Sequence, residues 1–323
     1  ADRQDVVMFL HDFSFKSPEE VLAEIGAGQG GGHGAGHGGG PGAPAAQGMP
    51  MGGMGAMQGM DHGAMGHGAM GGMPMGNMPG MGGMMGMAGM AMDLNDYDWD
   101  AYLANDRTLS DPDVVQGERG GRIRLRVINA AAATVFWIDT GAADGRLVAV
   151  DGHAVLPLPG NRFGLAMGQR LDIEIDLPNA GGTWPILALR EGARERTGLI
   201  LATQGAEVRR LDAVAETEAP AFDTDLAQEA RLSALNALPD RPVDRSQMLM
   251  LGGSMQPYVW TINGAVCGQR ISGARRDTVY VPPMAMITIA FDAGEAARWM
   301  LHCHHMPHLS TGMMTEFAVT ASA

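Results

Sequence analysis

The sequence has few cysteines, few basic residues and no long apolar run. Its 323 residues include two cysteines, too few for a disulfide framework, and this count leaves the redox compartment open. No stretch of about eighteen apolar residues occurs, so we expect no membrane span, and no charged-then-apolar signal peptide opens the chain. Lys and Arg number 22 against 36 acidic residues, giving a net charge of −14. This charge argues against nucleic acid as a partner and suits cations such as metal ions.

Residues 26–92 lack aromatic residues, Lys, Arg, Leu, Ile and Val. Glycine, alanine and methionine dominate there, with four histidines: His33, His37, His62 and His67. Several methionines recur at every third position, a period that matches neither a buried helix face nor a strand, and so much glycine disfavours both. We therefore predict a flexible, disordered insertion. Thioethers favour Cu(I) and imidazoles accept Cu(II), so copper recruitment is one interpretation and a low-complexity linker is the other.

The rest of the chain has the alternating pattern of an all-β protein. Short alternating segments predict the strands of an antiparallel sandwich at 122–130, 134–140, 146–155, 170–177, 184–191 and 197–203. A second set of expected strands lies at 247–253, 258–264, 277–292, 297–305 and 312–320. We expect helices over 17–26, where Ser17 and Glu20 form a capping box, and over 223–238.

These elements predict two β-domains. The first covers residues 1–205 and contains the insertion 26–92. An acidic linker with a helix, 206–245, connects it to a shortened second domain, 246–323.

The sequence "HCHHMPHLSTGMM" at residues 302–314 places metal-binding side chains at regular intervals. On a strand, His302 and His304 point to one face and Cys303 to the other, so one backbone can contribute to two metal sites. Cys303 is followed five residues later by His308 and five later again by Met313. Thiolate, imidazole and a weak thioether are the ligands of a blue-copper electron-transfer site.

Other interpretations of these residues remain open. Cys303 is able to form a disulfide with Cys267, and a zinc site is possible but would leave Met313 unused. His305 has no clear role and is expected to be a solvated loop residue. His11 and His153 stand alone in strand-like surroundings and are expected to be structural, while "DYDWD" at 96–100 is expected to form a solvated turn.

The terminal motif resembles that of the multicopper oxidases of the laccase-like and copper-tolerance type. Their last motif, H-C-H-x3-H-x4-M with a glycine just before the methionine, matches residues 302–313 position by position. The preceding "ARRDTVYVPPMAMITIAFDAGEAARWML" resembles the strands that lead into it. The first half resembles the middle domain of the family, which has a cupredoxin fold and no copper of its own. The resemblance implies two cupredoxin-like Greek-key β-sandwiches.

The resemblance also implies a set of metal roles. Cys303, His308 and Met313 would bind a type 1 copper that accepts single electrons from a small donor. His302 and His304 would each bind one copper of a trinuclear centre, where dioxygen is reduced to water. Cys303 and its flanking histidines, His302 and His304, would be the catalytic residues that pass the electrons between the centres. A periplasmic or otherwise exported location and a role in copper resistance follow by the same analogy.

Two departures from the family pattern weaken these expectations. The family builds its trinuclear centre from four H-x-H pairs, two of them in an N-terminal domain that we do not find in this sequence. A third pair belongs to an "HPxHLHG"-like segment, whose first histidine also completes the type 1 site. The corresponding residues here are "AVCGQRIS", and no histidine occurs between 154 and 301.

We therefore expect a multicopper oxidase, laccase-like or cuprous, that is incomplete in this chain. The alternatives are a non-catalytic protein that sequesters copper through the Met/His-rich segment and the terminal cluster, and a degenerate chain without a stable last domain.

Overall fold

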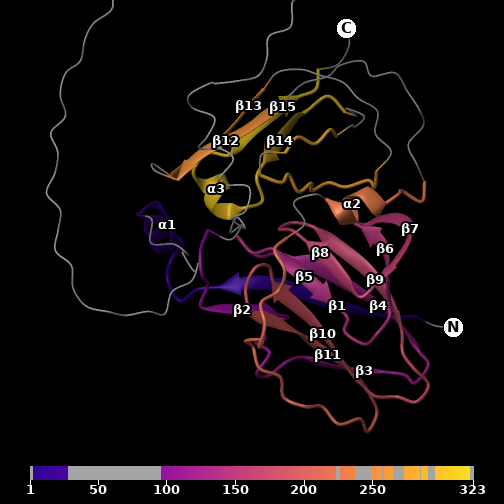
Figure 1. The fold of residues 1–323 in the computed structure, drawn as a ribbon. Coiled ribbons are helices and arrows are strands. Elements are labelled where there is room, and N and C mark those ends of the chain that lie inside the picture. Colours follow the sequence, from indigo (N-terminus) through magenta and orange to yellow (C-terminus); the bar gives the residue numbers. More distant parts are fainter. Residues whose placement is uncertain are drawn as a thin grey trace, which may run out of the picture. The chain divides into compact units, whose positions relative to one another are not determined.

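The computed structural model describes residues 3–27, 96–222, 226–236, 249–255, 258–264, 273–283, 285–289 and 295–320 (Figure 1). These residues belong to one compact unit, Ala1–Gly32 with Ala91–Ala323. The predicted insertion lies outside the described residues from position 28 onward. Within the described part, no helix is long and apolar enough to cross a membrane.

The first part of the chain folds into two sheets (Figure 1). One has the strand order β2–β1–β4–β9–β6–β7 and the other β3–β11–β10–β5–β8. The strands are β1 Arg3–Phe13, β2 Ala101–Ala104, β3 Val114–Gly117, β4 Arg122–Asn129, β5 Phe136–Asp139, β6 Gly145–Val150, β7 His153–Gly160, β8 Arg162–Leu165, β9 Arg170–Asp176, β10 Thr183–Arg190 and β11 Arg196–Thr203.

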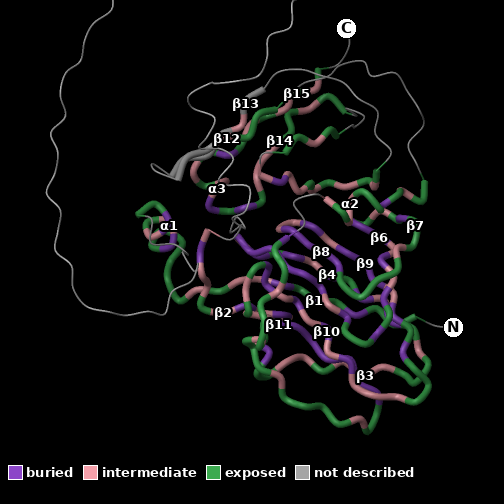
Figure 2. Tube along the Cα trace, in the orientation of Figure 1, coloured by how far each residue is buried: buried purple, intermediate pink, exposed green. Residues whose placement is uncertain are grey.

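Apolar and polar residues alternate along the strands, and the apolar side chains form the core between the two sheets. In β4, Ile123, Leu125 and Val127 are buried while the arginines between them face outward. β4 pairs in parallel with β1 and antiparallel with β9, so it occupies the middle of its sheet. Figure 2 shows burial concentrated in these strands. The all-β fold class predicted from the sequence is confirmed.

Helix α1, Pro18–Gly26, lies between β1 and β2 in the sequence, and it contacts residues on the other side of the predicted insertion. The helix has the expected capping box, in which Ser17 Oγ accepts from Glu20 N–H and the Glu20 carboxylate accepts from Ser17 N–H. Its buried face packs against Tyr97, and the Tyr97 hydroxyl donates to the Glu24 carboxylate at 3.0 Å. Lys16 Nζ donates to the same carboxylate at 2.7 Å. The chain before residue 28 and the chain after residue 95 are thereby held together.

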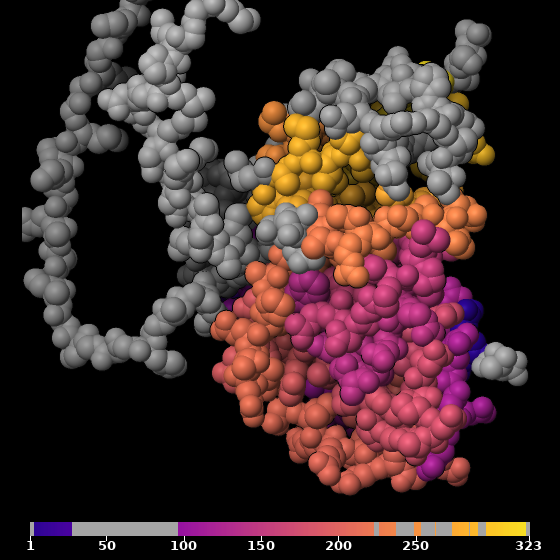
Figure 3. All heavy atoms as spheres, turned by 45° about the vertical axis from the view of Figure 1, so that its right-hand side comes forward, coloured from indigo at the N-terminus to yellow at the C-terminus, as the bar shows by residue number. Residues whose placement is uncertain are grey.

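The linker helix is shorter than predicted. Helix α2 covers Ala227–Arg231 instead of residues 223–238. Leu232 turns into an extended conformation and is buried in the main core, and the following residues pair with β7. In Figure 3, orange atoms of this part of the chain border the magenta atoms of the sandwich. Along β7, Leu156 N–H donates to Ser233 O at 2.9 Å and Leu235 N–H to Ala154 O at 3.0 Å. Pairing with a strand edge thus replaces the helical bonds that local propensity favoured.

The described residues after position 248 form two antiparallel strand pairs and one short helix. They are β12 Leu249–Met255 with β13 Tyr258–Gly264, β14 Arg298–His302 with β15 Met314–Ala318, and α3 Met306–Ser310. The prediction of a strand over 277–292 is wrong where the structure describes these residues: they form neither helix nor strand. Pro282 and Pro283 provide no N–H for a ladder. The domain boundaries at 205 and 246 stay a prediction.

Candidate metal centre

The terminal loop, residues 302–313, leaves β14 and returns to β15 as a closed turn. Cys303 N–H donates to Met313 O at 3.0 Å, and Met313 N–H donates to His308 O at 3.0 Å. The loop brings Cys303 Sγ to 3.9 Å from His308 Nδ1. Met313 is only 6 % exposed. The three residues that the sequence predicts as ligands of a blue-copper site, Cys303, His308 and Met313, therefore lie in one closed loop.

Cys303 is a free thiol in a partly buried position. Burial raises the pKa of the Cys303 thiol, and the His305 N–H, 3.3 Å from Sγ, opposes this by donating to the sulfur. A bound cation displaces a proton from such a thiol. The alternative disulfide partner, Cys267, lies outside the described residues.

His302 and His304 lie next to each other, with ring centroids 5.0 Å apart and an interplanar angle of 37°. Strand β14 ends at His302, so the expected extension of the strand through His304 is wrong, yet the two rings still come together. Burial lowers the pKa of His304, and the neighbouring His302 lowers it further. A neutral imidazole is the form that binds a metal ion.

His305 is buried, which contradicts its interpretation as a solvated loop residue. It is 4 % exposed, and its ring stacks on His308 with centroids 3.9 Å apart and an angle of 26°. Nitrogen lone pairs lie in the plane of the ring. Two stacked, nearly parallel imidazoles therefore do not direct them at one ion, although Asp96, His305 and His308 have ligand atoms within 4.8 Å of one another. In this geometry His305 packs against His308 and does not share a metal with it.

Asp96 is a site residue that sequence reasoning missed. Its Oδ2 lies 2.9 Å from His308 Nε2, and its side chain is only 13 % exposed, so "DYDWD" is not a solvated turn at this residue. A carboxylate on Nε2 fixes the ring orientation and leaves Nδ1, the nitrogen facing Cys303, as the candidate ligand. The two residues are 212 positions apart. No local pattern could have connected them.

The terminal loop is also bonded to the backbone of the sandwich. Met306 N–H, at the start of α3, donates to Ala132 O at 2.8 Å. Ala132 belongs to a turn that Asp12 holds: its carboxylate accepts from Ala132 N–H at 2.9 Å, Ala133 N–H at 3.0 Å and Thr134 Oγ1 at 2.9 Å. Burial raises the pKa of Asp12, while these bonds act in the opposite direction.

Replacing Asp12 with alanine is expected to lower the free energy of unfolding by about 2 kcal/mol, because buried donors lose their acceptor. Urea denaturation of the metal-free chain measures the change. Asp111→Ala is the matched control, since the Asp111 side chain is 84 % exposed and pairs with Arg107 four residues earlier. The control is expected to change the free energy by less than about 0.5 kcal/mol. Equal losses in both variants would contradict the role given to Asp12.

Two sequence profiles described as multicopper oxidase match this chain, one at residues 77–206 and the other at 247–323. Together they cover strands β2 to β15 and include the terminal loop. The chain belongs to the multicopper oxidase family. Multicopper oxidases use copper as their cofactor, so the metal implied for the terminal loop is copper.

Sequence relatives include other multicopper oxidases. Multicopper oxidase MmcO of Mycobacterium tuberculosis is 27 % identical over 270 residues, which are 69 % of this chain and 51 % of that protein. A laccase of Cryphonectria parasitica is 33 % identical over 67 residues, 21 % of this chain and 11 % of the laccase. The chain thus spans about half the length of MmcO.

Solved structures of multicopper oxidases share the fold. The laccase of Botrytis aclada has a TM-score of 0.61 at 16 % identity, covering 98 % of this chain and 64 % of that structure. Fet3p, described as a multicopper oxidase that functions in iron import, has a TM-score of 0.59 at 9 % identity, covering 98 % of this chain and 66 % of that structure. The predicted cupredoxin-type fold is thereby confirmed.

The donor set of the terminal loop fits copper. A first-row ion binds imidazole nitrogen at about 2.0 Å and thiolate sulfur at about 2.3 Å, so the 3.9 Å between Cys303 Sγ and His308 Nδ1 allows one ion to contact both. Thiolate suits both copper and zinc, and a thioether beside thiolate and imidazole is typical of a blue-copper site. The adjacent His302 and His304 offer imidazole donors of the kind that the family's trinuclear centre uses.

Proposed function

We propose that this chain provides the electron-accepting copper site of a multicopper oxidase, with Cys303, His308 and Met313 as three of its ligands. The observation that carries the proposal is the 3.9 Å approach of Cys303 Sγ to His308 Nδ1 inside a loop closed at Met313. Bound copper supplies one-electron redox chemistry, which these side chains lack. The protein fixes the ligands and limits access of water.

Each neighbour of the ligands has a defined task in this proposal. Asp96 accepts from His308 Nε2–H and orients the ring. The His305 ring covers one face of His308, and its backbone N–H donates to the Cys303 sulfur. Met306 N–H ties the loop to Ala132. Electrons from a small donor, Cu(I) or a phenol, enter at this site.

His302 and His304 are proposed as one histidine pair of the oxygen-reducing centre. The rings are adjacent, and burial lowers the pKa of His304. The family's other three pairs have no counterpart in this sequence, and we propose that an N-terminal cupredoxin domain supplies two of them. A periplasmic or otherwise exported location, with a role in copper resistance, belongs to the same proposal.

A donor titration of the copper-loaded chain without oxygen tests this function. Cu(I), and separately a simple phenol, is expected to bleach a blue absorption with about one electron per chain, as one type 1 copper requires. Oxygen is then admitted and its uptake is recorded. We expect no uptake above that of free copper, because one histidine pair is not a complete centre.

Two results would contradict the proposal. Copper bound in several weak equivalents without blue colour would support the sequestering protein instead. Oxygen uptake above free copper would show that this chain completes an oxygen-reducing centre by itself. A His304→Ala variant tells whether that centre includes the proposed pair.

A further inference from the structure

The ring of His304 lies directly against the backbone of Gly168. Gly168 stands between β8 and β9 with φ +76°, in the left-handed region. A Cβ built on Gly168 would be 2.7 Å from both Cγ and Nδ1 of His304, closer than atoms approach in proteins. Only glycine leaves the space that the imidazole occupies. The position of a proposed metal ligand is thus set by a turn of the sandwich.

Hydrogen bonds fix the Gly168 turn on both sides. Gly168 N–H donates to Asn129 O at 2.9 Å, and Asn129 N–H donates to Gln169 O at 3.1 Å. The carbonyl of Gly168 accepts from Arg170 Nη1 at 3.2 Å. Asn129 is fully buried and its amide donates to two further carbonyls, those of Thr134 and Leu165. The surface that contacts His304 therefore has little freedom to shift.

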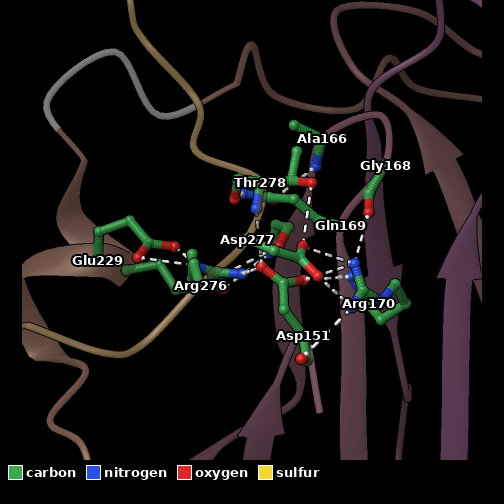
Figure 4. A network of polar contacts seen from close by, with 11 residues as sticks. Asp151, Ala166, Gly168, Gln169, Arg170, Glu229, Arg276, Asp277 and Thr278 are labelled. Atoms are coloured by element: carbon green, nitrogen blue, oxygen red, sulfur yellow. Dashed lines mark hydrogen bonds and ion pairs between the residues drawn. The ribbon is translucent and has the colours of Figure 1, made fainter. Parts of the chain in front are cut away.

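Arg170 is oriented in turn by the segment that precedes the terminal loop. Asp277 accepts two hydrogen bonds from its guanidinium, each 2.7 Å long (Figure 4). The guanidinium lowers the pKa of Asp277. Asp151 lies 3.8 Å from Arg170 and also contacts Arg276, which pairs with Glu229 of α2. The pair belongs to a larger ionic network that joins three parts of the chain.

We propose that Gly168, supported by the Arg170–Asp277 pair, is a positioning site that sets the orientation of His304 for copper binding. The inference rests on the proposed function, which makes His304 a ligand. An imidazole binds a metal only along the lone pair in its ring plane, so the tilt of the ring decides how well the ion fits. Residues that orient a ligand without touching the metal typically change metal affinity by about 10–100-fold.

Gly168→Ala tests the proposal, with Gly205→Ala as the matched control. Both glycines have a left-handed φ, +76° and +79°, but a Cβ at Gly205 meets open space. Backbone strain is therefore common to the two variants, and only the first displaces His304. Both variants are made in a chain that also carries Cys303→Ser, which removes the blue site. The copper lost when His304→Ala is added to the same background is the copper bound by the histidine pair.

We expect Gly168→Ala to weaken Cu(II) binding by about 10–100-fold in competition with a chelator, and to change the electron paramagnetic resonance spectrum. Gly205→Ala is expected to retain the parent affinity. In the metal-free chain, proton NMR should show a shift of the His304 ring signals in Gly168→Ala only. Thermal unfolding should fall to a similar degree in both variants.

Asp277→Asn and Asp176→Asn provide a second comparison. Both carboxylates have a pKa lowered by a partner arginine, Arg170 for Asp277 and Arg122 for Asp176. Of these two arginines, Arg170 contacts Gly168. The Asp277 carboxylate also acts on His304 through its charge, which raises the pKa of the ring, so the His304 ring signals in the metal-free chain are compared as well. Weaker Cu(II) binding in Asp277→Asn, with unchanged binding in Asp176→Asn, is the expected result.

The outcomes distinguish this inference from the proposed function. If His304→Ala weakens copper binding but Gly168→Ala does not, or if Gly205→Ala weakens it equally, the positioning role is wrong and the ligand assignment stands. If His304→Ala leaves copper binding unchanged, the assignment of the pair is wrong and the inference falls with it.

Discussion

Replacing Cys303 with serine is expected to abolish the blue colour of the copper-loaded chain completely. The colour of a type 1 copper arises from its bond to a thiolate, and a serine hydroxyl is neither soft nor readily deprotonated. The loop itself should survive. Serine is close in size to cysteine, and its oxygen is able to accept the His305 N–H that now donates to the sulfur at 3.3 Å.

Visible absorption and electron paramagnetic resonance during Cu(II) titration measure this effect. The small copper hyperfine splitting of the parent should give way to the larger splitting of ordinary Cu(II), or the signal should vanish. Cys267→Ser is the matched control, because it removes the only other thiol of the chain, and it should leave the colour unchanged. Blue colour that survives in Cys303→Ser would refute the assignment of the thiolate.

Arg276→Met should produce the largest loss of stability, about 3 kcal/mol in the free energy of unfolding. The side chain of Arg276 is 4 % exposed and contacts the fully buried carboxylate of Asp151 at 3.4 Å. It also pairs with Glu229 through two hydrogen bonds. Removing one member of a buried ion pair leaves an uncompensated charge, which costs about 3–5 kcal/mol. Arg170, 3.8 Å from Asp151, offsets part of this cost.

Urea unfolding of the metal-free chain gives the comparison with Arg298→Met. Arg298 also pairs with a carboxylate, that of Glu316, but the two side chains are 75 % and 53 % exposed. Such surface pairs contribute at most about 1 kcal/mol. Equal effects of the two substitutions would mean that Arg276 is not part of a buried network in solution.

Sequence reasoning succeeded where the determining interactions are local. The capping box of α1 depends on Ser17 and Glu20, three residues apart, and the alternation in β4 is visible in adjacent residues. The spacing of Cys303, His308 and Met313 is likewise local, and the structure brings them into one closed loop. Their roles as copper ligands stay a prediction.

Sequence reasoning failed where contacts between distant segments determine the conformation or burial of a residue. His305 lies two residues before Pro307 and resembles a loop residue. It is nevertheless buried, because the hydrogen bond from Met306 N–H to Ala132 O holds this part of the loop against the sandwich. The roles of Asp96 and Gly168 depend on residues far along the chain, His308 and His304. Leu232 is extended, although the sequence predicted it to be helical. Its burial and the pairing of Ala234 with β7 outweigh helix propensity. Such effects are not encoded in any short window of sequence.

The contact between α1 and Tyr97 has a consequence for how this protein can change during evolution. Because Glu24 and Tyr97 hold the two sides of residues 28–95 together, the sandwich does not depend on the length of what lies between them. Under the prediction from sequence that the insertion is flexible, each doubling of its length costs only about 0.6 kcal/mol. Repeats of methionine, glycine and histidine can therefore be gained or lost there with little penalty to folding. Orthologues are expected to differ in this segment far more than in the sheets.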